Sequence, residues 1–465
     1  MSAELPVPSA VPPPADPEAP AGHRAPSTAL LTDRYELTML QAALADGTAG
    51  RRCVFEVFTR RLPAGRRYGV VAGTGRLLEA LADFRFGETE LSFLSRHGVV
   101  DAPTLRWLES YRFRGSITGY AEGEVFLPGS PLLVVEGTFA EALLLETLVL
   151  SVLNYDSAVA SAASRMTSAA LDRPCLEMGS RRAHEQAAVA AARAAVVAGF
   201  AGTSNLEAGR RYGLHTIGTA AHSYTLLHDD ERAAFRAQVA AQGVGTTLLV
   251  DTYDVAQGVR NAVEVAGPEL GAVRLDSGDL TQLAQEVRDQ LDELGATRTR
   301  IVVSSDLDEH AIAALAVAPV DSYGVGTSVV TGSGAPTCGM VYKLVAREGA
   351  DGALKPVAKA SAKKGSSGGR KSAARRLDAQ GRAVEEVVVT GADAAVASWA
   401  PPGPELRPLL VPLVDHGAVD TRWTGPQGVR VAAERHEQSR SELPLGARRL
   451  SHGDAAVPTV TLEVG

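Results

Sequence analysis

The feature that most restricts how this chain can fold is a regular alternation of short apolar runs and helical patterns between residues 175 and 325. Apolar runs of this length are typical of parallel strands buried on both faces. Periodic apolar positions such as Leu283, Val287 and Leu291 indicate the helices between them. Seven such strands predict a barrel like the (β/α)8 fold, complete or incomplete, rather than an open sheet. The predicted strands are residues 175–178, 197–201, 215–217, 247–250, 272–275, 301–303 and 322–325.

Polar residues stand at the end of every one of these predicted strands, and glycines accompany them in most cases. In barrels and open α/β sheets, ligands bind beyond the carboxyl ends of the strands. Small residues there leave backbone N–H groups accessible to a substrate. Seven strand ends of this kind therefore predict the floor of one pocket. The segments are residues 179–182, 202–205, 218–223, 251–254, 274–279, 304–306 and 324–327.

His222 stands among small residues in the segment GTAAHS, just after the predicted strand at residues 215–217. A histidine at a strand end can serve as a base, an acid, a metal ligand or a nucleophile. The alternative is a structural histidine that is held by a hydrogen bond. The polar ends of the other strands favour a chemical role for His222.

The predicted pocket contains cationic groups suited to an anionic substrate. Arg181, Arg182 and Arg274 can each bind a carboxylate or phosphate through paired donors. The alternative for Arg182 is an ion pair with a surface carboxylate. The glycine-containing segment 324–327 offers backbone N–H groups of the kind that bind phosphate.

Four aspartates at the strand ends could hold Mg²⁺, which takes few carboxylates and shares its shell with substrate phosphates. They are Asp251, Asp254, Asp276 and Asp279. Asp279 has a competing interpretation as a helix N-cap, because Gln282 stands three residues further on, and Asp254 has a similar alternative. The residues alone thus predict a soluble Mg²⁺-dependent enzyme that acts on a phosphorylated, anionic substrate.

The composition argues against several other classes of protein. A net charge of −8 over 465 residues gives no sign of a nucleic acid or an anionic membrane as partner. The longest apolar stretch, residues 139–153, is interrupted by Glu141 and Glu146, so we predict a buried helix rather than a membrane span. The three cysteines lie far apart in the sequence, so we expect no disulfide framework, which fits a protein of a reducing compartment. With no signal-peptide pattern, we expect a cytoplasmic protein.

The chain divides into four predicted parts. The Pro/Ala-rich residues 1–28 are predicted to be a disordered tail. Residues 29–140 mix helical and strand patterns in an N-terminal domain, and residues 141–345 form the barrel with the active site. Residues 346–465 are expected to pack on the N-terminal domain and to be partly flexible. Their basic run, residues 359–376, is either a solvated loop or an anion-binding loop.

Seven segments resemble the nicotinate phosphoribosyltransferase family and occur in the family's order. They are TDRYELTM, GSRRAHE, GTSNLEAG, GTAAHS, VDTYD, VRLDSGDL and GVGTSVVT. The resemblance implies the type II phosphoribosyltransferase fold, with a mixed N-terminal domain and an irregular α/β barrel, in a homodimer with shared active sites. It implies a ligase-type reaction in which nicotinate and phosphoribosyl pyrophosphate (PRPP) give nicotinate mononucleotide and pyrophosphate. Mg²⁺ and hydrolysis of ATP, through a phosphohistidine, belong to the implied reaction, which begins the salvage of nicotinate for NAD.

The resemblance also assigns catalytic roles. His222 matches the histidine that ATP phosphorylates, and Asp251 is placed by its motif to orient that histidine. Asp276 is expected beside the ribose or the metal. Asp279 is a second candidate ligand for Mg²⁺.

The family's substrate contacts map onto further residues. Arg274 matches the arginine that binds the pyridine carboxylate, and Thr219 matches a contact to the same ring. Tyr35 matches a tyrosine that stacks on the ring from the neighbouring subunit, although a packing tyrosine is the alternative. The other residues expected to bind substrate are Arg181, Thr203, Ser223, Gly324, Gly326 and Thr327.

Two positions separate nicotinate from nicotinamide as the substrate. The related nicotinamide enzyme has an aromatic residue at the position of Met178 and an acid at the position of Ser204. An acid there would accept the amide of nicotinamide and repel a carboxylate, so Ser204 favours nicotinate. The alternatives are a nicotinamide or quinolinate phosphoribosyltransferase, a non-catalytic paralogue and a barrel aldolase or isomerase.

Overall fold

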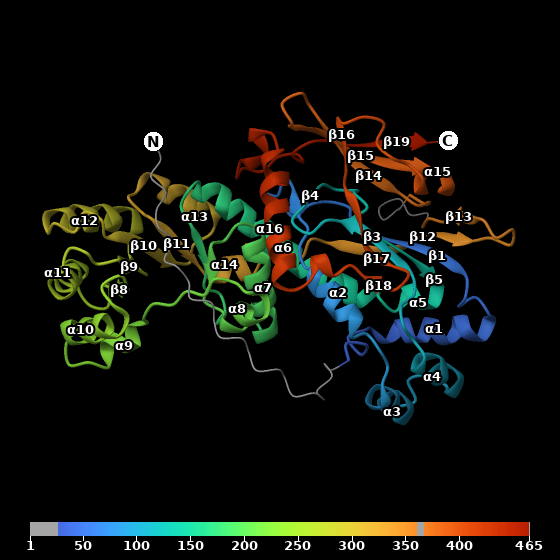
Figure 1. Cartoon of the computed structure of the whole chain (residues 1–465), viewed down its shortest axis with the longest axis horizontal. Coiled ribbons are helices and arrows are strands. Elements are labelled where there is room, and N and C mark those ends of the chain that lie inside the picture. Colours follow the sequence, from blue (N-terminus) through green and yellow to red (C-terminus); the bar gives the residue numbers. More distant parts are fainter. Residues whose placement is uncertain (1–26, 360–366, 465) are drawn as a thin grey trace.

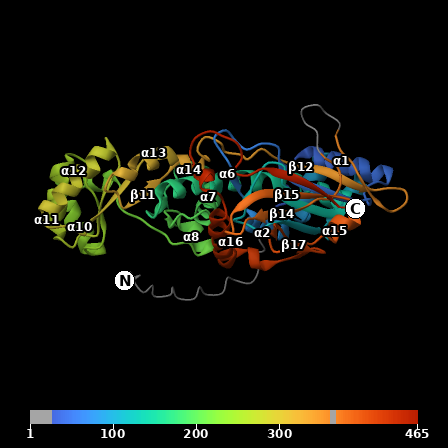
Figure 2. The ribbon, with the colours of Figure 1, turned by 90° about the horizontal axis from the view of Figure 1, so that it is seen from above.

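The computed structural model describes residues 27–359 and 367–464. These residues form an elongated molecule whose two lobes lie along its long axis (Figures 1 and 2). A parallel sheet with its helices forms the barrel lobe, and mainly antiparallel sheets with their helices form the second lobe. Most of the predicted tail, residues 1–26, lies outside the described residues.

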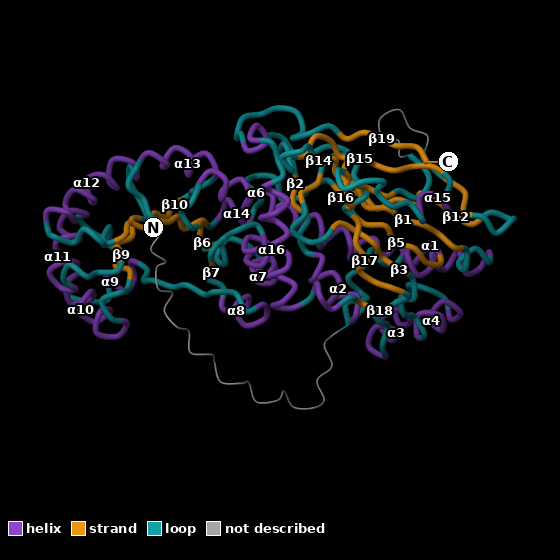
Figure 3. The backbone as a smooth tube through the Cα atoms, turned by 45° about the horizontal axis from the view of Figure 1, so that its top comes forward, coloured by secondary structure: helices purple, strands orange, loops and turns teal. Residues whose placement is uncertain are grey.

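The barrel lobe contains a parallel sheet with the strand order β7-β6-β11-β10-β9-β8. A bridge between Thr203 and Thr216 extends this sheet beyond β7. The sheet is curled, and helices cover it from outside (Figure 3). The predicted barrel is thus confirmed in its incomplete form. The strands are β6 (Cys175–Glu177), β7 (Gly202–Thr203), β8 (Thr247–Leu249), β9 (Ala272–Leu275), β10 (Arg300–Ser305) and β11 (Ser322–Val325).

Short helices and longer ones connect these strands. Three of the longer ones, α10, α11 and α12, lie at the end of the lobe furthest from the second lobe (Figure 1). The helices of the barrel lobe are α7 (Glu185–Val197), α8 (Leu206–Tyr212), α9 (His222–Leu226), α10 (Glu231–Gln242), α11 (Val255–Ala266), α12 (Leu280–Glu293), α13 (Glu309–Ala314) and α14 (Thr327–Val330).

Two of the predicted strands were wrong. Residues 197–201 do not form a strand, because α7 continues to Val197 and the chain then turns at Gly199, whose φ is +97°. The stretch before Val197 is rich in alanine, the strongest helix former, so the helix takes in residues whose apolar character also suits a strand. Residues 215–217 contribute a single bridge at Thr216 instead of a strand.

The second lobe is built on a seven-stranded antiparallel sheet with the order β13-β12-β1-β5-β3-β17-β18. Its three central strands come from the first third of the chain, and both flanks come from residues after 339. The strands are β1 (Arg52–Thr59), β3 (Ser116–Tyr120), β5 (Leu133–Thr138), β12 (Met340–Glu348), β13 (Leu354–Pro356), β17 (Leu410–Asp415) and β18 (Ala418–Val419).

Two smaller sheets and six helices complete the second lobe. A four-stranded sheet has the order β16-β14-β15-β19, and β2 pairs with β4. These strands are β2 (Gly69–Val70), β4 (Val125–Phe126), β14 (Ser372–Leu377), β15 (Ala383–Gly391), β16 (Leu406–Pro408) and β19 (Thr459–Val464). The helices are α1 (Arg34–Asp46), α2 (Thr74–Ala82), α3 (Glu88–Arg96), α4 (Ala102–Glu109), α15 (Asp393–Ala397) and α16 (Gly425–Ser441).

The predicted buried helix is the pair α5 (Phe139–Leu143) and α6 (Glu146–Ala170), which joins the two lobes. By length and composition the stretch Phe139–Ala170 could cross a membrane, but 67% of its apolar window is buried inside the molecule. Leu148 belongs to the core of the second lobe, and Met166 belongs to the core of the barrel lobe. The helix is therefore a core element shared by both lobes.

A buried ion pair also connects the lobes. Arg193 on α7 donates to Glu122, which follows β3, and both side chains are fully buried. Glu122 also accepts the backbone N–H groups of Gly73 and Gly75 at the start of α2. Burial alone would raise the pKa of Glu122, but Arg193 and the two N–H groups outweigh burial and lower it.

The described part of the basic run is held by carboxylates. Arg375 is fully buried beside Glu124. Although burial opposes ionisation, the neighbouring guanidinium groups lower the pKa of Glu124 to about 2. Residues 360–366 of the run lie outside the described residues. Four of the run's cations form ion pairs with glutamates: Arg370, Lys371, Arg375 and Arg376.

Candidate active site

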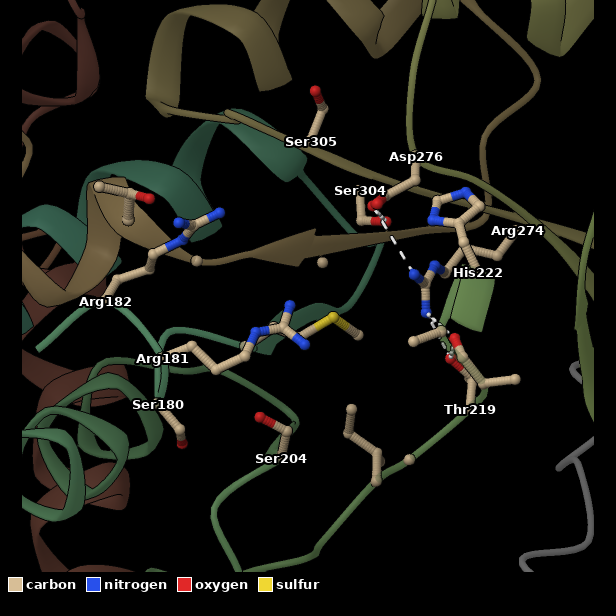
Figure 4. Close-up of a pocket in the computed structure, with 18 of the residues that line it drawn as sticks. Ser180, Arg181, Arg182, Ser204, Thr219, His222, Arg274, Asp276, Ser304 and Ser305 are labelled. Atoms are coloured by element: carbon tan, nitrogen blue, oxygen red, sulfur yellow. Dashed lines mark hydrogen bonds and ion pairs between the residues drawn. The ribbon is translucent and has the colours of Figure 1, made fainter. Parts of the chain in front are cut away.

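A cavity of about 810 Å³ lies at the carboxyl ends of the parallel strands (Figure 4). Six of the seven predicted strand-end segments contribute to its wall, and the segment 251–254 lies behind it. Sequence reasoning therefore located the cavity. Nine predicted site residues line it: Arg181, Thr219, His222, Ser223, Arg274, Asp276, Gly324, Gly326 and Thr327.

His222 is the first residue of α9, and its ring is oriented by Asp251. The distance from His222 Nε2 to Asp251 Oδ1 is 3.1 Å. The other carboxylate oxygen of Asp251 accepts the backbone N–H of Asp276 at 2.8 Å and the hydroxyl of Ser277 at 2.9 Å. The side chain of Asp251 is 2% exposed, whereas that of His222 is 39% exposed. Asp251 therefore acts as a buried support for a histidine that faces the cavity.

Arg274 lies in strand β9, and its guanidinium is held against the loop that contains Thr219 and Ala220. One terminal nitrogen donates to the hydroxyl of Thr219 and to the carbonyl of Ala220. The other lies 3.8 Å from Asp276 Oδ1. The buried Nε has no hydrogen-bond partner among the described residues. Burial also lowers the pKa of Arg274 from its ordinary value.

Two further arginines line the wall on the side of β6. Figure 4 shows Arg181 and Arg182 above Ser180 and Ser204, across the cavity from Arg274. Neither arginine forms an ion pair with another residue of the described chain, so the interpretation of Arg182 as a partner of a surface carboxylate is not supported. Both charges remain available to an anionic ligand.

Tight packing at two glycines shapes the floor of the cavity. A Cβ atom on Gly324 would lie 2.8 Å from Met178 Sδ and 3.0 Å from Ser304 Cβ. A Cβ atom on Gly179 would lie 2.2 Å from Val330 Cγ1. The position of Gly179 therefore requires glycine, because the backbone carbonyl oxygen of Gly326 would also lie 2.9 Å from its Cβ atom, whereas a side chain at Gly324 would have to displace Met178.

Four residues proposed from sequence lie away from the cavity wall, in addition to Asp251. Thr203 is fully buried and donates its hydroxyl to Glu177. Asp279 and Asp254 are helix N-caps: Asp279 accepts the backbone N–H of Gln282 at 3.3 Å, and Asp254 accepts the backbone N–H of Gln257 at 2.8 Å. Tyr35 lies on α1 in the second lobe, so it does not reach the cavity of its own chain.

Sequence reasoning placed residues 304–306 in the pocket floor without giving them individual roles, and it did not single out Glu177. Ser304 donates its hydroxyl to Asp276, and Ser305 and Asp306 line the wall. The buried carboxyl of Glu177 accepts the backbone N–H of Gly179 in addition to the Thr203 hydroxyl, and burial raises its pKa. A single acid inside the apolar strand CLEM was the signal for Glu177.

Comparisons with known proteins identify the family. Residues 30–154 match the nicotinate phosphoribosyltransferase (NAPRTase) N-terminal domain, and residues 174–380 match the nicotinate phosphoribosyltransferase (NAPRTase) family. The chain belongs to the nicotinate phosphoribosyltransferase family. This membership confirms the resemblance seen in the sequence motifs.

Relatives of this family cover nearly the whole chain. The sequence is 57% identical to nicotinate phosphoribosyltransferase pncB1 of Mycobacterium tuberculosis (strain CDC 1551 / Oshkosh), over 93% of this chain and 95% of that protein. It is 34% identical to the nicotinate phosphoribosyltransferase of Homo sapiens, over 71% of this chain and 73% of that protein. The crystal structure of human nicotinic acid phosphoribosyltransferase aligns with a TM-score of 0.76 at 28% identity, covering 92% of this chain and 97% of that chain.

The family's fold agrees with the observed one. The curled parallel sheet beside a mixed lobe is the type II phosphoribosyltransferase arrangement expected from the motifs. Five of the seven nicotinate phosphoribosyltransferase-like segments contribute residues to the cavity wall, namely those around Arg181, Ser204, His222, Arg274 and Thr327. The cavity is therefore the candidate active site.

Proposed function

We propose that this family member converts nicotinate and PRPP to nicotinate mononucleotide and pyrophosphate, with coupled hydrolysis of ATP. The observation that carries the proposal is the way in which the guanidinium of Arg274 is held at the cavity wall. Its guanidinium is fixed by Thr219 at the cavity wall, while its buried Nε has no partner in the described chain. A guanidinium fixed in this way can bind a planar carboxylate through paired donors.

The proposed reaction is a displacement at the anomeric carbon of PRPP. The pyridine nitrogen of nicotinate forms the new C–N bond, and the bond to the pyrophosphate oxygen breaks with its electron pair. The attacking nitrogen carries no proton, so the reaction needs no general base. The protein therefore contributes by positioning both substrates and by stabilising the charge that develops on pyrophosphate, with Arg181 and Arg182 as nearby cations.

The geometry around His222 supports its role as the phosphate acceptor from ATP. A carboxylate accepts hydrogen bonds and does not donate them, so contact with Asp251 places the proton on Nε2. The lone pair of Nδ1 is then free to attack the γ-phosphorus of ATP, with ADP as the leaving group. Hydrolysis of the resulting phosphohistidine returns phosphate and neutral His222.

Mg²⁺ is the proposed metal, and the donors on the wall fit it. Asp276 and Asp306 both line the cavity, and Asp276 is the residue we expect to hold the ion. Among the described residues, no group of three or more His, Cys, Asp or Glu side chains is placed to hold a metal by itself. Such a sparse set suits Mg²⁺, which takes one or two carboxylates and completes its shell with substrate phosphates and water. When bound, the ion would neutralise charge on the pyrophosphate.

The wall opposite Arg274 favours the acid over the amide as substrate. Ser204 and Met178 line the cavity there, and neither carries a charge. A carboxylate at position 204 would accept the N–H groups of nicotinamide, whereas it would repel nicotinate. Because Ser204 is uncharged, it does not repel the carboxylate of nicotinate that Arg274 is proposed to bind.

We also propose that the enzyme acts as a homodimer in which Tyr35 completes the partner's site. Tyr35 and Met39 lie one turn apart on α1 and are 45% and 37% exposed, and the preceding Leu31 is 61% exposed. An exposed apolar strip of this kind is typical of an interaction surface. In a twofold dimer, the second lobe of one copy would face the barrel lobe of the other.

The experiment that tests the function measures product from PRPP with nicotinate or nicotinamide, with and without ATP. We expect nicotinate mononucleotide, formed faster with ATP, and one ADP released per coupled turnover. Turnover of nicotinamide alone would contradict the interpretation of Ser204. The absence of turnover with either substrate would contradict the proposed function itself.

A further inference from the structure

The turn that follows the segment 324–327 is unusually constrained. Helix α14 is a single turn that begins at Thr327 in the cavity wall. It ends at Val330, and in the turn that follows the backbone N–H of Ser333 donates to the carbonyl of Ser328 at 2.7 Å. Gly332, Ser333 and Gly334 all have positive φ angles, and the value for Ser333 is +51°. A non-glycine residue adopts this conformation when its surroundings impose it.

Arg66 from the second lobe contacts this turn directly. It precedes β2 in sequence and is 7% exposed. One terminal nitrogen donates to the carbonyl of Gly332 at 2.6 Å. The other donates to the carbonyl of Ser161 on α6 at 3.5 Å and lies 3.5 Å from Glu309 Oε1. One guanidinium group thus connects the second lobe, α6 and the turn after α14.

Glu309 connects the same turn to a second strand end. It is the first residue of α13, shortly after the cavity-lining Asp306, and is 4% exposed. Its Oε2 accepts the hydroxyl of Ser333, and its Oε1 accepts Nε of Arg165 at 2.9 Å. Burial alone would raise the pKa of Glu309, but the hydroxyl and the two arginines outweigh burial and lower it.

We propose that Arg66 is a positioning residue that sets the segment 324–327 for binding of PRPP phosphate. This inference rests on the proposed function. A single-turn helix cannot hold its own orientation, so the pairing of β11 before it and the contacts at its C-terminal end together set where Gly326 and Thr327 lie. Arg66 supplies the contact to Gly332 and shares Glu309 with Ser333. Arg66 does not line the cavity, so it acts through the turn and not on the substrate.

The test compares Arg66→Lys with a matched control, Arg173→Lys. Lysine keeps the charge but cannot divide its donors among three acceptors in the same planar fork. Arg173 also divides its guanidinium, between the carbonyls of Leu315 and Ala316 and the hydroxyl of Tyr323, but at the amino ends of the strands. We expect Arg66→Lys to raise KM for PRPP about tenfold and KM for nicotinate less than about twofold. Arg173→Lys should change neither KM by more than about twofold.

Ser333 provides a second variant that keeps the test valid if Arg66→Lys does not fold. Ser333→Ala removes the hydroxyl and retains the positive φ, whereas Ser333→Gly removes the hydroxyl and relieves the backbone strain. We expect both to raise KM for PRPP about threefold with KM for nicotinate unchanged, because both lose the bond to Glu309. An increase in both KM values by the same factor, or a lower melting temperature with both KM values unchanged, would overturn the proposal.

Ligand-induced stabilisation separates failure of this inference from failure of the proposed function. PRPP added to the unaltered enzyme should raise its melting temperature, because a ligand that binds the folded state stabilises it. The same concentration should raise the melting temperature of Arg66→Lys less, while Arg173→Lys should respond like the unaltered enzyme. No response of the unaltered enzyme would contradict the proposed function, whereas equal responses of all three would contradict the role of Arg66.

Discussion

The buried carboxylate of Asp251 contacts the ring of the more exposed His222 and so sets the orientation of that ring. The carboxylate oxygen Oδ1 lies 3.1 Å from Nε2 of the ring, and Oδ2 is occupied by the N–H of Asp276 and the hydroxyl of Ser277. Both oxygens are therefore committed to donors. The pair links the segment that carries His222 to the loop that follows β9.

Replacing Asp251 by asparagine should abolish ATP coupling while leaving the fold intact. An amide has one accepting and one donating end, so it cannot accept from both His222 and the N–H of Asp276. If the amide oxygen faces the N–H of Asp276, the amide NH2 faces His222 and the ring adopts the wrong tautomer. If the oxygen faces His222 instead, the amide NH2 faces the N–H of Asp276. We expect the ATP-stimulated rate to fall about 100-fold or more, by analogy with histidines that lose an orienting carboxylate. The measurement is ADP released per nicotinate mononucleotide formed.

The matched control for that variant is Ser277→Ala, which removes one donor from Oδ2 and leaves the His222 contact in place. It should retain most of the ATP stimulation. Full stimulation in Asp251→Asn would show that the pair is structural.

Replacing Arg274 by alanine should weaken nicotinate binding selectively. A lost charge-assisted hydrogen bond costs about 1.5–3 kcal/mol, so KM for nicotinate should rise about 10- to 100-fold. KM for PRPP should change much less, which steady-state kinetics with each substrate varied in turn will measure. Thr219→Val, which removes the hydroxyl that holds Arg274, should give a smaller change in the same direction. Equal changes for both substrates would place Arg274 at the phosphate site instead.

Placing an acid at Ser204 should shift the preference toward nicotinamide. Ser204→Asp adds a negative charge to the wall where Ser204 lines the cavity, so it should repel nicotinate and accept the amide N–H groups. We expect the ratio of kcat/KM for nicotinate to that for nicotinamide to fall at least about tenfold. Ser204→Asn introduces a side chain of nearly the same size as aspartate but without the charge, so it serves as the control. If both variants lower the ratio equally, size and not charge decides the preference.

Mixing two variants that are each impaired in ATP-stimulated turnover should restore that activity if the sites are shared. Tyr35→Ala and His222→Ala lie in different lobes, so a mixed dimer would contain one doubly altered site and one intact site. Co-expression should therefore give about a quarter of the activity of the unaltered dimer, since half of the dimers are mixed. Two independently purified and unmixed preparations provide the baseline. No recovery in verified mixed dimers would assign Tyr35 to packing within its own chain.

Stability should fall in mild acid because of His436 on α16. Burial, together with the charge of Arg440, lowers the pKa of His436 to about 3, and its Nε2 contacts the hydroxyl of Ser164. Between the ordinary value near 6.5 and about 3, the unfolded chain binds a proton that the folded chain does not. Unfolding is therefore favoured as the pH falls, by about 1.4 kcal/mol per pH unit from this group.

Urea unfolding at a series of pH values between about 7 and 4.5 measures this effect, with His436→Gln as the comparison. Glutamine can still bond to Ser164 but does not titrate, so the slope of stability against pH should be shallower by one proton. Equal slopes for the two proteins would show that His436 is not the group responsible.

The sequence predicted the position of the cavity because strand ends in a parallel sheet are set by local pattern. Arg274 lies near the end of β9 and Asp306 follows β10, and the topology brings such ends together. The same local reasoning could not decide Asp279, where the pattern of an N-cap and that of a metal ligand coincide. The structure places Asp279 as the N-cap.

Contacts between segments that are distant in sequence could not be predicted from local sequence patterns. Glu122 and Arg193 are separated by α5 and α6, and nothing in the sequence around either residue identifies the other as its partner. The assignment of Thr203 to substrate binding followed a matching motif, but the hydroxyl is taken by Glu177 from the adjacent strand. The helix end at Val197 was missed because an alanine-rich helix and a buried strand are both apolar.

The interleaved sheet of the second lobe has a consequence for how the chain matures on the ribosome. Strands β1, β5 and β3 are made first, but their flanking partners β12 and β17 begin at Met340 and Leu410. Both outer edges of this nascent sheet stay open until most of the polypeptide has been synthesised, and open edges favour pairing with other chains. Completion of this sheet therefore waits for strands that are made after all of the barrel strands, even though the first residues of the lobe leave the ribosome before those of the barrel.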